Sequence, residues 1–147
     1  SEPYSIEKGG VKPVVFLLAD HGYPSYAETV VVTRDTLAKK PDALKKFVQA
    51  SAEGWKSYLA NPAAGNVLIK KDNPQMDDGL LAFGHAKIKE YGLVTGGDAA
   101  KQGILTMTDD RWKKTYDFMV NANMLNRKVD VKRAYTLDMV KDSKVLP

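Results

Sequence analysis

Residues 41–61 show the clearest hydrophobic periodicity in the chain. Their larger side chains recur at steps of three and four residues, the spacing that places side chains on one stripe of a helix: Leu44, Phe47, Val48, Ser51, Trp55, Tyr58 and Leu59. Pro41 suits the first helical position. Asn61-Pro62 ends the helix because proline disfavours helical geometry in the residue before it. We therefore predict a helix over 41–61 whose apolar stripe covers a sheet.

Two short apolar runs precede this helix and predict strands. Residues 13–19 (PVVFLLA) form a continuous apolar run, typical of a strand buried on both faces in a parallel sheet. Residues 29–33 (TVVVT) predict a second strand, and residues 20–24 between them predict a turn or linker. Two strands rarely form a self-sufficient sheet. We therefore expect the sheet to gain strands from elsewhere, either from a missing N-terminal part or from a second copy of the chain.

The rest of the pattern is mainly helical. The predicted helical segments are 4–8, 33–40, 62–71, 77–91, 108–123 and 137–140. Thr108 followed by Asp109 and Asp110 is typical of a capped helix start. Residues 93–107 hold three glycines and little periodicity, so they predict a loop with a short extended piece at 104–105.

The composition limits the classes of protein to which the chain can belong. The chain has 147 residues, 44% hydrophobic and 27% charged, which is typical of one soluble globular domain. Its net charge is +4, but Lys and Arg are spread over several helix faces, so we expect no nucleic-acid partner. The absence of cysteine excludes disulfides, thiolate metal sites and a cysteine nucleophile. The chain begins with Ser1 and not with Met, so we expect it to be the back part of a longer protein.

The sequence offers no catalytic constellation. His21 and His85 are the only histidines and lie far apart, which is a weak metal signal. There is no glycine-rich phosphate loop and no serine in a nucleophile elbow. The pair Asp109-Asp110 is explained by helix capping. We predict no catalytic residue, no metal ligand and no cofactor.

Residues 20–26 (DHGYPSY) are the segment whose side chains are best suited to bind a ligand. They join the two predicted strands and combine an acid, an imidazole and two tyrosines, whereas a linker made for solvent does not need the tyrosines. Ligand sites are concave and are lined by aromatic side chains with a few polar groups. The predicted ligand-binding residues are Asp20, His21, Tyr23 and Tyr26, joined by Glu2 if the first segment folds back. The alternative is a hinge whose tyrosines pack locally.

Several segments together resemble a known family. They begin with Ser1-Glu2-Pro3-Tyr4 and Asp20-x-Gly22-Tyr23, and continue with residues 66–74, 87–92, 107–112 and 129–137. In order and spacing they resemble the C-terminal part of a periplasmic solute-binding protein of an ABC transporter. The branch is the nitrate/sulfonate/taurine and thiamine-pyrimidine-precursor group.

The resemblance implies an α/β fold, a helix-rich lobe of the type II periplasmic-binding-protein kind with an incomplete sheet. Residues 1–22 would end lobe two and cross between the lobes, and residues 23–147 would form the returning part of lobe one. It further implies a periplasmic protein, not an enzyme, that captures a small molecule in an interlobe cleft and delivers it to a membrane permease.

By position, the resemblance places Glu2 near the cleft floor and Tyr23 and Tyr26 beside the crossing. Tyrosines there could stack on a flat heteroaromatic ligand or donate hydrogen bonds to an oxyanion. A pyrimidine precursor, a sulfonate, nitrate and a flavin-like solute all remain open as ligands.

Two other functions stay open beside this one. The first is an enzyme like the thiamine-pyrimidine synthases that uses His21 or Glu2; the lack of the cysteines of that family argues against it. The second is an isolated lobe that acts only as an interaction or structural fragment through its open sheet edge.

Overall fold

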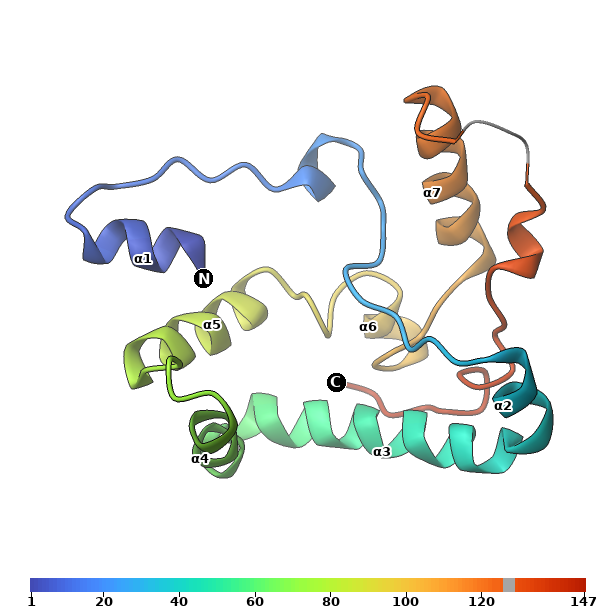
Figure 1. Cartoon of the computed structure of the whole chain (residues 1–147), viewed down its shortest axis with the longest axis horizontal. Coiled ribbons are helices and arrows are strands. Elements are labelled where there is room, and N and C mark those ends of the chain that lie inside the picture. The colour runs from blue at the N-terminus through green and yellow to red at the C-terminus, as the bar shows by residue number, and fades with distance from the viewer. Residues whose placement is uncertain (126–128) are drawn as a thin grey trace.

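The computed structural model describes residues 1–125 and 129–147, and these residues form helices joined by irregular segments (Figure 1). The elements in chain order are α1 (Glu2–Lys8), the 3-10 helix η1 (Leu18–His21), α2 (Arg34–Lys39), α3 (Pro41–Ala60), α4 (Ala63–Asp72), α5 (Asp78–Glu90), α6 (Ala99–Gln102), α7 (Asp109–Asn121) and the 3-10 helix η2 (Val131–Arg133). None of these helices combines the length and the apolar content that crossing a membrane requires.

The 20-residue helix α3 forms one edge of the molecule, with α2 at one end and α4 at the other (Figure 1). The C-terminal tail runs back along it. The buried apolar side chains of the described residues are Val48, Ala52 and Leu59 of α3 itself, with Leu81 of α5, Ile104 and Val140. The predicted helix over 41–61 is confirmed, and its apolar stripe faces this small core.

The stripe of α3 is covered only in part. Phe47, predicted to face inward, exposes 55% of its surface. Trp55 and Tyr58 are half-buried. The predicted sheet that would cover this side is not found among the described residues, so part of the apolar stripe meets solvent.

Local side-chain caps explain where three helices begin. The side-chain oxygens of Thr33, Asp77 and Thr108 each accept a hydrogen bond from the backbone amide three residues later, at 3.0, 2.7 and 3.2 Å. Each bond satisfies an amide that has no partner within its own helix. The helix starts predicted near residues 33, 77 and 108 are therefore confirmed.

Three short elements differ from the prediction. The predicted loop over 93–107 contains the four-residue helix α6, which is too short to show a helical period. Residues 137–140 form a turn and not a helix, because the amides of Val140 and Lys141 both donate to the carbonyl of Leu137 and the pattern stops there. The predicted extended piece at 104–105 is wrong: these residues form a turn in which the Thr106 amide donates to the Gly103 carbonyl at 3.2 Å and Leu105 has a φ of 65°. This turn contacts the tail, since the Ile104 amide donates to the Val145 carbonyl at 2.8 Å.

The two predicted strands are wrong for the described structure. Residues 13–17 and 29–33 are irregular. A strand needs the hydrogen-bonding edge of a neighbouring strand, and no described segment supplies such an edge to either of them. Their apolar side chains are accordingly exposed, to 80% at Val14 and 86% at Val31. The helix-rich character is confirmed, but the described residues form no sheet.

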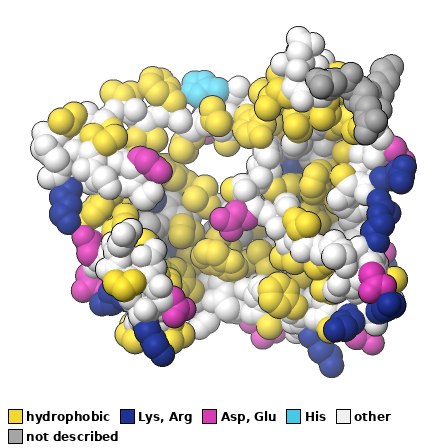
Figure 2. All heavy atoms as spheres, in the orientation of Figure 1, with side chains coloured by type: hydrophobic (Ala, Val, Ile, Leu, Met, Phe, Trp, Pro, Cys, Tyr) yellow, Lys and Arg dark blue, Asp and Glu magenta, His cyan; other side chains and the backbone are white. Residues whose placement is uncertain are grey.

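The segment between α1 and α2, residues 9–33, which we call the arm, is irregular except for η1 and has a distinct place in the molecule. It runs as an arm on the side opposite α3 and descends past α7 before it reaches α2 (Figure 1). Apolar side chains lie at the surface along this arm (Figure 2). The arm carries most of the residues predicted to bind a ligand.

Candidate functional site

The structure places the predicted site residues in three separate surroundings. Glu2 lies in the first turn of α1, where its exposed carboxylate is 3.4 Å from the N-terminal amine. The pKa of Glu2 is lowered, chiefly by a hydrogen bond from its own backbone amide. Helix α1 packs against α5, with the ring centroids of Tyr4 and Phe83 5.5 Å apart, so Glu2 is not brought beside Tyr23 and Tyr26 (Figure 1).

Asp20 and His21 lie in η1 and are both exposed. The imidazole ring of His21 faces the ring of Phe16, with a centroid distance of 6.1 Å. Gly22 ends η1 with a φ of 87°, a left-handed conformation that glycine adopts at little cost. This turn separates the exposed acid and imidazole from the tyrosines that follow.

Tyr23 and Tyr26 both pack on α7, and both are half-buried. The ring of Tyr23 lies 4.9 Å from that of Phe118, and the ring of Tyr26 lies 5.7 Å from that of Trp112. The Tyr26 hydroxyl accepts a hydrogen bond from the Thr108 amide at 2.8 Å. The structure therefore brings the two predicted tyrosines together on one helix, α7, through contacts between segments far apart in the sequence.

Arg111, which no sequence pattern singled out, also contacts the segment of the predicted tyrosines. Its Nε donates to the Pro24 carbonyl at 2.7 Å and its Nη2 donates to the Ser25 carbonyl at 3.0 Å. The guanidinium carbon lies 4.4 Å from the centroid of the Tyr26 ring, within the range of a cation–π contact. The segment 107–112 carried part of the family resemblance, but its charged residues were interpreted only as the start of a helix.

An aromatic row continues around the first turn of α7. The ring of Trp112 stacks on that of Tyr135, with centroids 4.7 Å apart and planes 1° from parallel. Tyr135 donates a hydrogen bond to Asp109, whose carboxylate lies 2.6 Å from the ammonium of Lys132. The pKa of Asp109 is lowered, mainly by the hydrogen bond from Lys132 and next by the one from Tyr135. The pKa of Tyr135 is raised, mainly by its burial.

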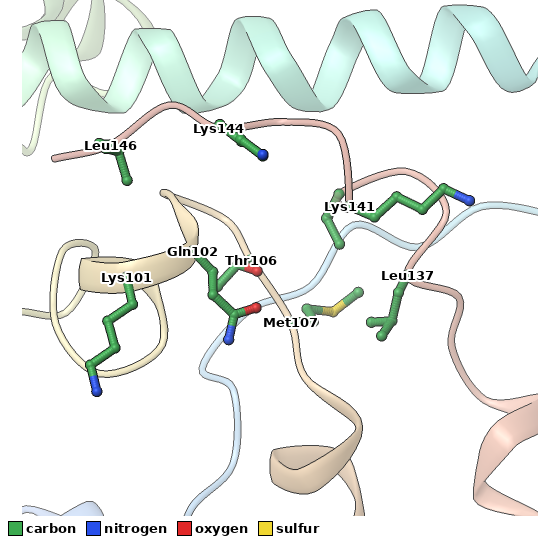
Figure 3. Close-up of a pocket in the computed structure, with 9 residues that line it drawn as sticks. Lys101, Gln102, Thr106, Met107, Leu137, Lys141, Lys144 and Leu146 are labelled. Carbon is green, nitrogen blue, oxygen red and sulfur yellow. The ribbon is translucent and has the colours of Figure 1, made fainter.

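A depression of about 450 Å³ lies between α6 and the C-terminal tail, outside the predicted site (Figure 3). Apolar side chains of Met107 and Leu137 lie within it. Three lysines contribute to its lining, but the chains of Lys101 and Lys141 project away from each other (Figure 3). The cations therefore do not converge on one point.

Comparison with known proteins adds two matches. The family described as NMT1/THI5 like matches residues 1–65. The riboflavin-binding protein RibY of Chloroflexus aurantiacus is 30% identical over 141 residues, an alignment that covers 95% of this chain and 40% of the relative. The chain thus spans about 40% of the length of this curated relative. No solved structure matches the chain significantly.

Proposed function

We propose that the chain, which is similar to NMT1/THI5-like proteins and to a solute-binding relative, is part of the solute-binding component of an ABC importer. The observation that carries the proposal is the similarity to a binding protein along 95% of the chain. The name of the relative, a riboflavin-binding protein, supports a binding role rather than a catalytic one. In this proposal the protein works in the periplasm and hands its solute to a membrane permease.

We propose a flat heteroaromatic solute of the flavin type as the ligand. The named relative is a riboflavin-binding protein, and an isoalloxazine ring offers both a face for stacking and polar edge atoms for hydrogen bonds. The residues proposed to face this ligand are Asp20, His21, Tyr23 and Tyr26 of the arm and Glu2 of α1, and closure of the two lobes would have to bring Glu2 to the other four. The exposure of Asp20 and His21 leaves their polar atoms accessible to a solute.

The fold proposed for the whole protein is α/β and two-lobed. Residues 1–22 end lobe two and cross, and residues 23–147 form the returning part of lobe one. The unpaired apolar segments 13–17 and 29–33 support this proposal, since both have strand composition and both lack a partner among the described residues. Polypeptide outside these residues, or a second copy, supplies the missing strands.

A calorimetric titration of the whole protein with riboflavin tests the proposal. We expect saturable binding with one riboflavin for each protein. Loss of both rings in the Tyr23→Ala/Tyr26→Ala variant should weaken binding by about tenfold or more, because an aromatic contact contributes ~0.5–1.5 kcal/mol beyond its buried area.

The matched control is Tyr91→Ala, which removes a 38% exposed tyrosine that follows α5 and whose ring contacts the ammonium of Lys87. This variant should bind riboflavin like the unaltered protein. Equal affinity in the double variant would remove the tyrosines from the site, and no heat with riboflavin or a thiamine-pyrimidine precursor would remove the proposed ligand class.

A further inference from the structure

We propose that Arg111 is the positioning residue of the arm: its guanidinium holds residues 24–26 on the first turn of α7 and thereby sets the affinity for the solute. The inference deepens the proposed solute-binding function and rests on it. Arg111 itself does not contact the solute in this proposal. It acts through the backbone and the ring that it holds.

One side chain makes three contacts with three consecutive residues. The Arg111 guanidinium donates to the carbonyls of Pro24 and Ser25, at 2.7 and 3.0 Å, and lies over the ring of Tyr26 at 4.4 Å. Only a planar group with several fixed donors can make this set of contacts, because the lysine ammonium is a point charge without a face that stacks. The three contacts therefore depend on arginine and not on positive charge alone.

A second set of hydrogen bonds, also at the start of α7, attaches residues 24–26 to this helix. The Thr108 amide donates to the Tyr26 hydroxyl at 2.8 Å, and the Thr108 hydroxyl donates to the Asp98 carboxylate at 3.0 Å. The Arg111 amide donates to the same Thr108 hydroxyl at 3.2 Å. Tyr26 is thus held at its ring by Arg111 and at its hydroxyl by Thr108.

The arm depends on this attachment because its flanks are weakly held. Before it, Gly22 adopts a left-handed turn, and after it, residues 28–33 pair with no described segment. The contacts on α7 are therefore the point at which the described structure fixes the path of the arm. The exposed side chains of Asp20 and His21 and the ring of Tyr23 lie directly before this point.

A fixed arm increases affinity by preorganisation. When a binding segment already holds its bound arrangement, the free energy of ordering it is not subtracted from the binding free energy. If only a fraction of the molecules holds the binding arrangement, the apparent dissociation constant rises by the inverse of that fraction. Releasing residues 24–26 from α7 should therefore weaken binding without removing any group that touches the solute.

The test compares Arg111→Ala and Arg111→Lys in the whole protein, with Arg133→Ala as the control. Arg133 is an exposed arginine of η2, so the control removes the same charge and volume from another place. Two quantities are measured well below the melting temperature: the riboflavin dissociation constant, and the hydrogen exchange of the Thr108 amide by NMR.

We expect Arg111→Ala to weaken riboflavin binding by about tenfold and to speed exchange of the Thr108 amide by a similar factor, as loss of an arginine-specific contact set predicts. Arg111→Lys, which keeps the charge, should recover only a small part of the riboflavin affinity and of the protection of the Thr108 amide. Arg133→Ala should match the unaltered protein in both.

A merely stabilising contact would lower the melting temperature of Arg111→Ala and leave the riboflavin affinity of the folded protein unchanged, and that result overturns the proposal. Full recovery by Arg111→Lys also overturns it. If the unaltered protein does not bind riboflavin, the proposed ligand fails, and the Thr108 exchange then decides the positioning role: protection retained in Arg111→Ala refutes it, and protection lost supports it.

Discussion

At the scale of single residues, Asp77 joins the first helix to the fifth. Its carboxylate accepts the Leu80 amide at 2.7 Å, lies 2.9 Å from the Lys8 ammonium and accepts the Tyr4 hydroxyl at 3.3 Å. A Cβ at Gly79 would lie 2.1 Å from the Tyr4 hydroxyl oxygen, so a larger residue there would displace the Tyr4 side chain. The pKa of Asp77 is lowered, first by the Leu80 amide and then by Lys8.

This pKa shift makes the stability of the protein depend on pH at Asp77. A lowered pKa in the folded state means that the carboxylate stabilises the fold fully above its ordinary value of 3.8 and loses that effect as the pH falls through the folded value. Asp77→Asn keeps a capping side chain but removes the charge. We expect the unaltered protein to be the more stable at pH 7 and the difference to shrink below about pH 4.

Urea unfolding followed by circular dichroism at pH 7, 5 and 3 measures this difference. Asp72→Asn is the control, since Asp72 ends α4 away from α1 and should show a small difference at every pH. A difference for Asp77→Asn that stays constant from pH 7 to pH 3 would show that charge does not contribute.

At the scale of elements, only some of the apolar side chains of α3 are buried against the rest of the fold. Leu59 exposes 9% of its surface, whereas Phe47, on the same predicted stripe, exposes 55%. Val48 and Ala52 are also buried. The stabilising contribution of this helix therefore comes from the buried positions and not from the size of each apolar side chain.

Truncating Leu59 and Phe47 to alanine should destabilise the fold in the reverse order of side-chain size: the loss of stability should be larger for Leu59. Leu59→Ala should lower the free energy of unfolding by about 2–4 kcal/mol, since it removes buried methyl groups and leaves a cavity. Phe47→Ala should cost less than ~1 kcal/mol because its ring is already largely in water. Chemical denaturation of both variants measures the two values, and an equal or larger loss for Phe47→Ala would mean that another surface covers α3 in solution.

The helices were predictable from the sequence because their determinants are local. The period of 41–61 and the cap at Thr108 lie within the segments that they specify, so these helices were placed to within about two residues at each end. The strands at 13–19 and 29–33 were predicted from composition alone. A strand also needs a pairing edge, and no described segment supplies one.

The same distinction applies to the site. Tyr23 and Tyr26 were singled out because their chemistry is visible in one short segment. Arg111 was missed because its two carbonyl acceptors lie 87 and 86 residues earlier, and backbone carbonyls leave no mark in a sequence. Whether the chosen residues bind a solute stays a prediction.

At the scale of the whole molecule, the described residues leave two apolar segments without a cover. Residues 13–17 and 29–33 carry exposed β-branched and aromatic side chains, and neither segment forms a ladder with another described segment. Segments of this kind are templates for pairing with another chain. The arm therefore exposes apolar side chains on a backbone that could still pair, whereas the exposed Phe47, Val67 and Leu68 lie on helices.

The 147-residue chain studied alone should consequently self-associate through the arm. We expect sedimentation velocity to show a mass that increases with protein concentration, and the Val14→Lys/Val31→Lys variant to shift it toward the monomer, since charge on a strand edge opposes pairing. The control is Val67→Lys/Leu68→Lys on α4, where the side chains are similarly exposed but the backbone is already bonded within the helix. If both variants reduce association equally, general hydrophobicity drives it; if the unaltered chain stays monomeric at all concentrations, the arm is no pairing surface, and the proposal of a completed sheet loses its physical support.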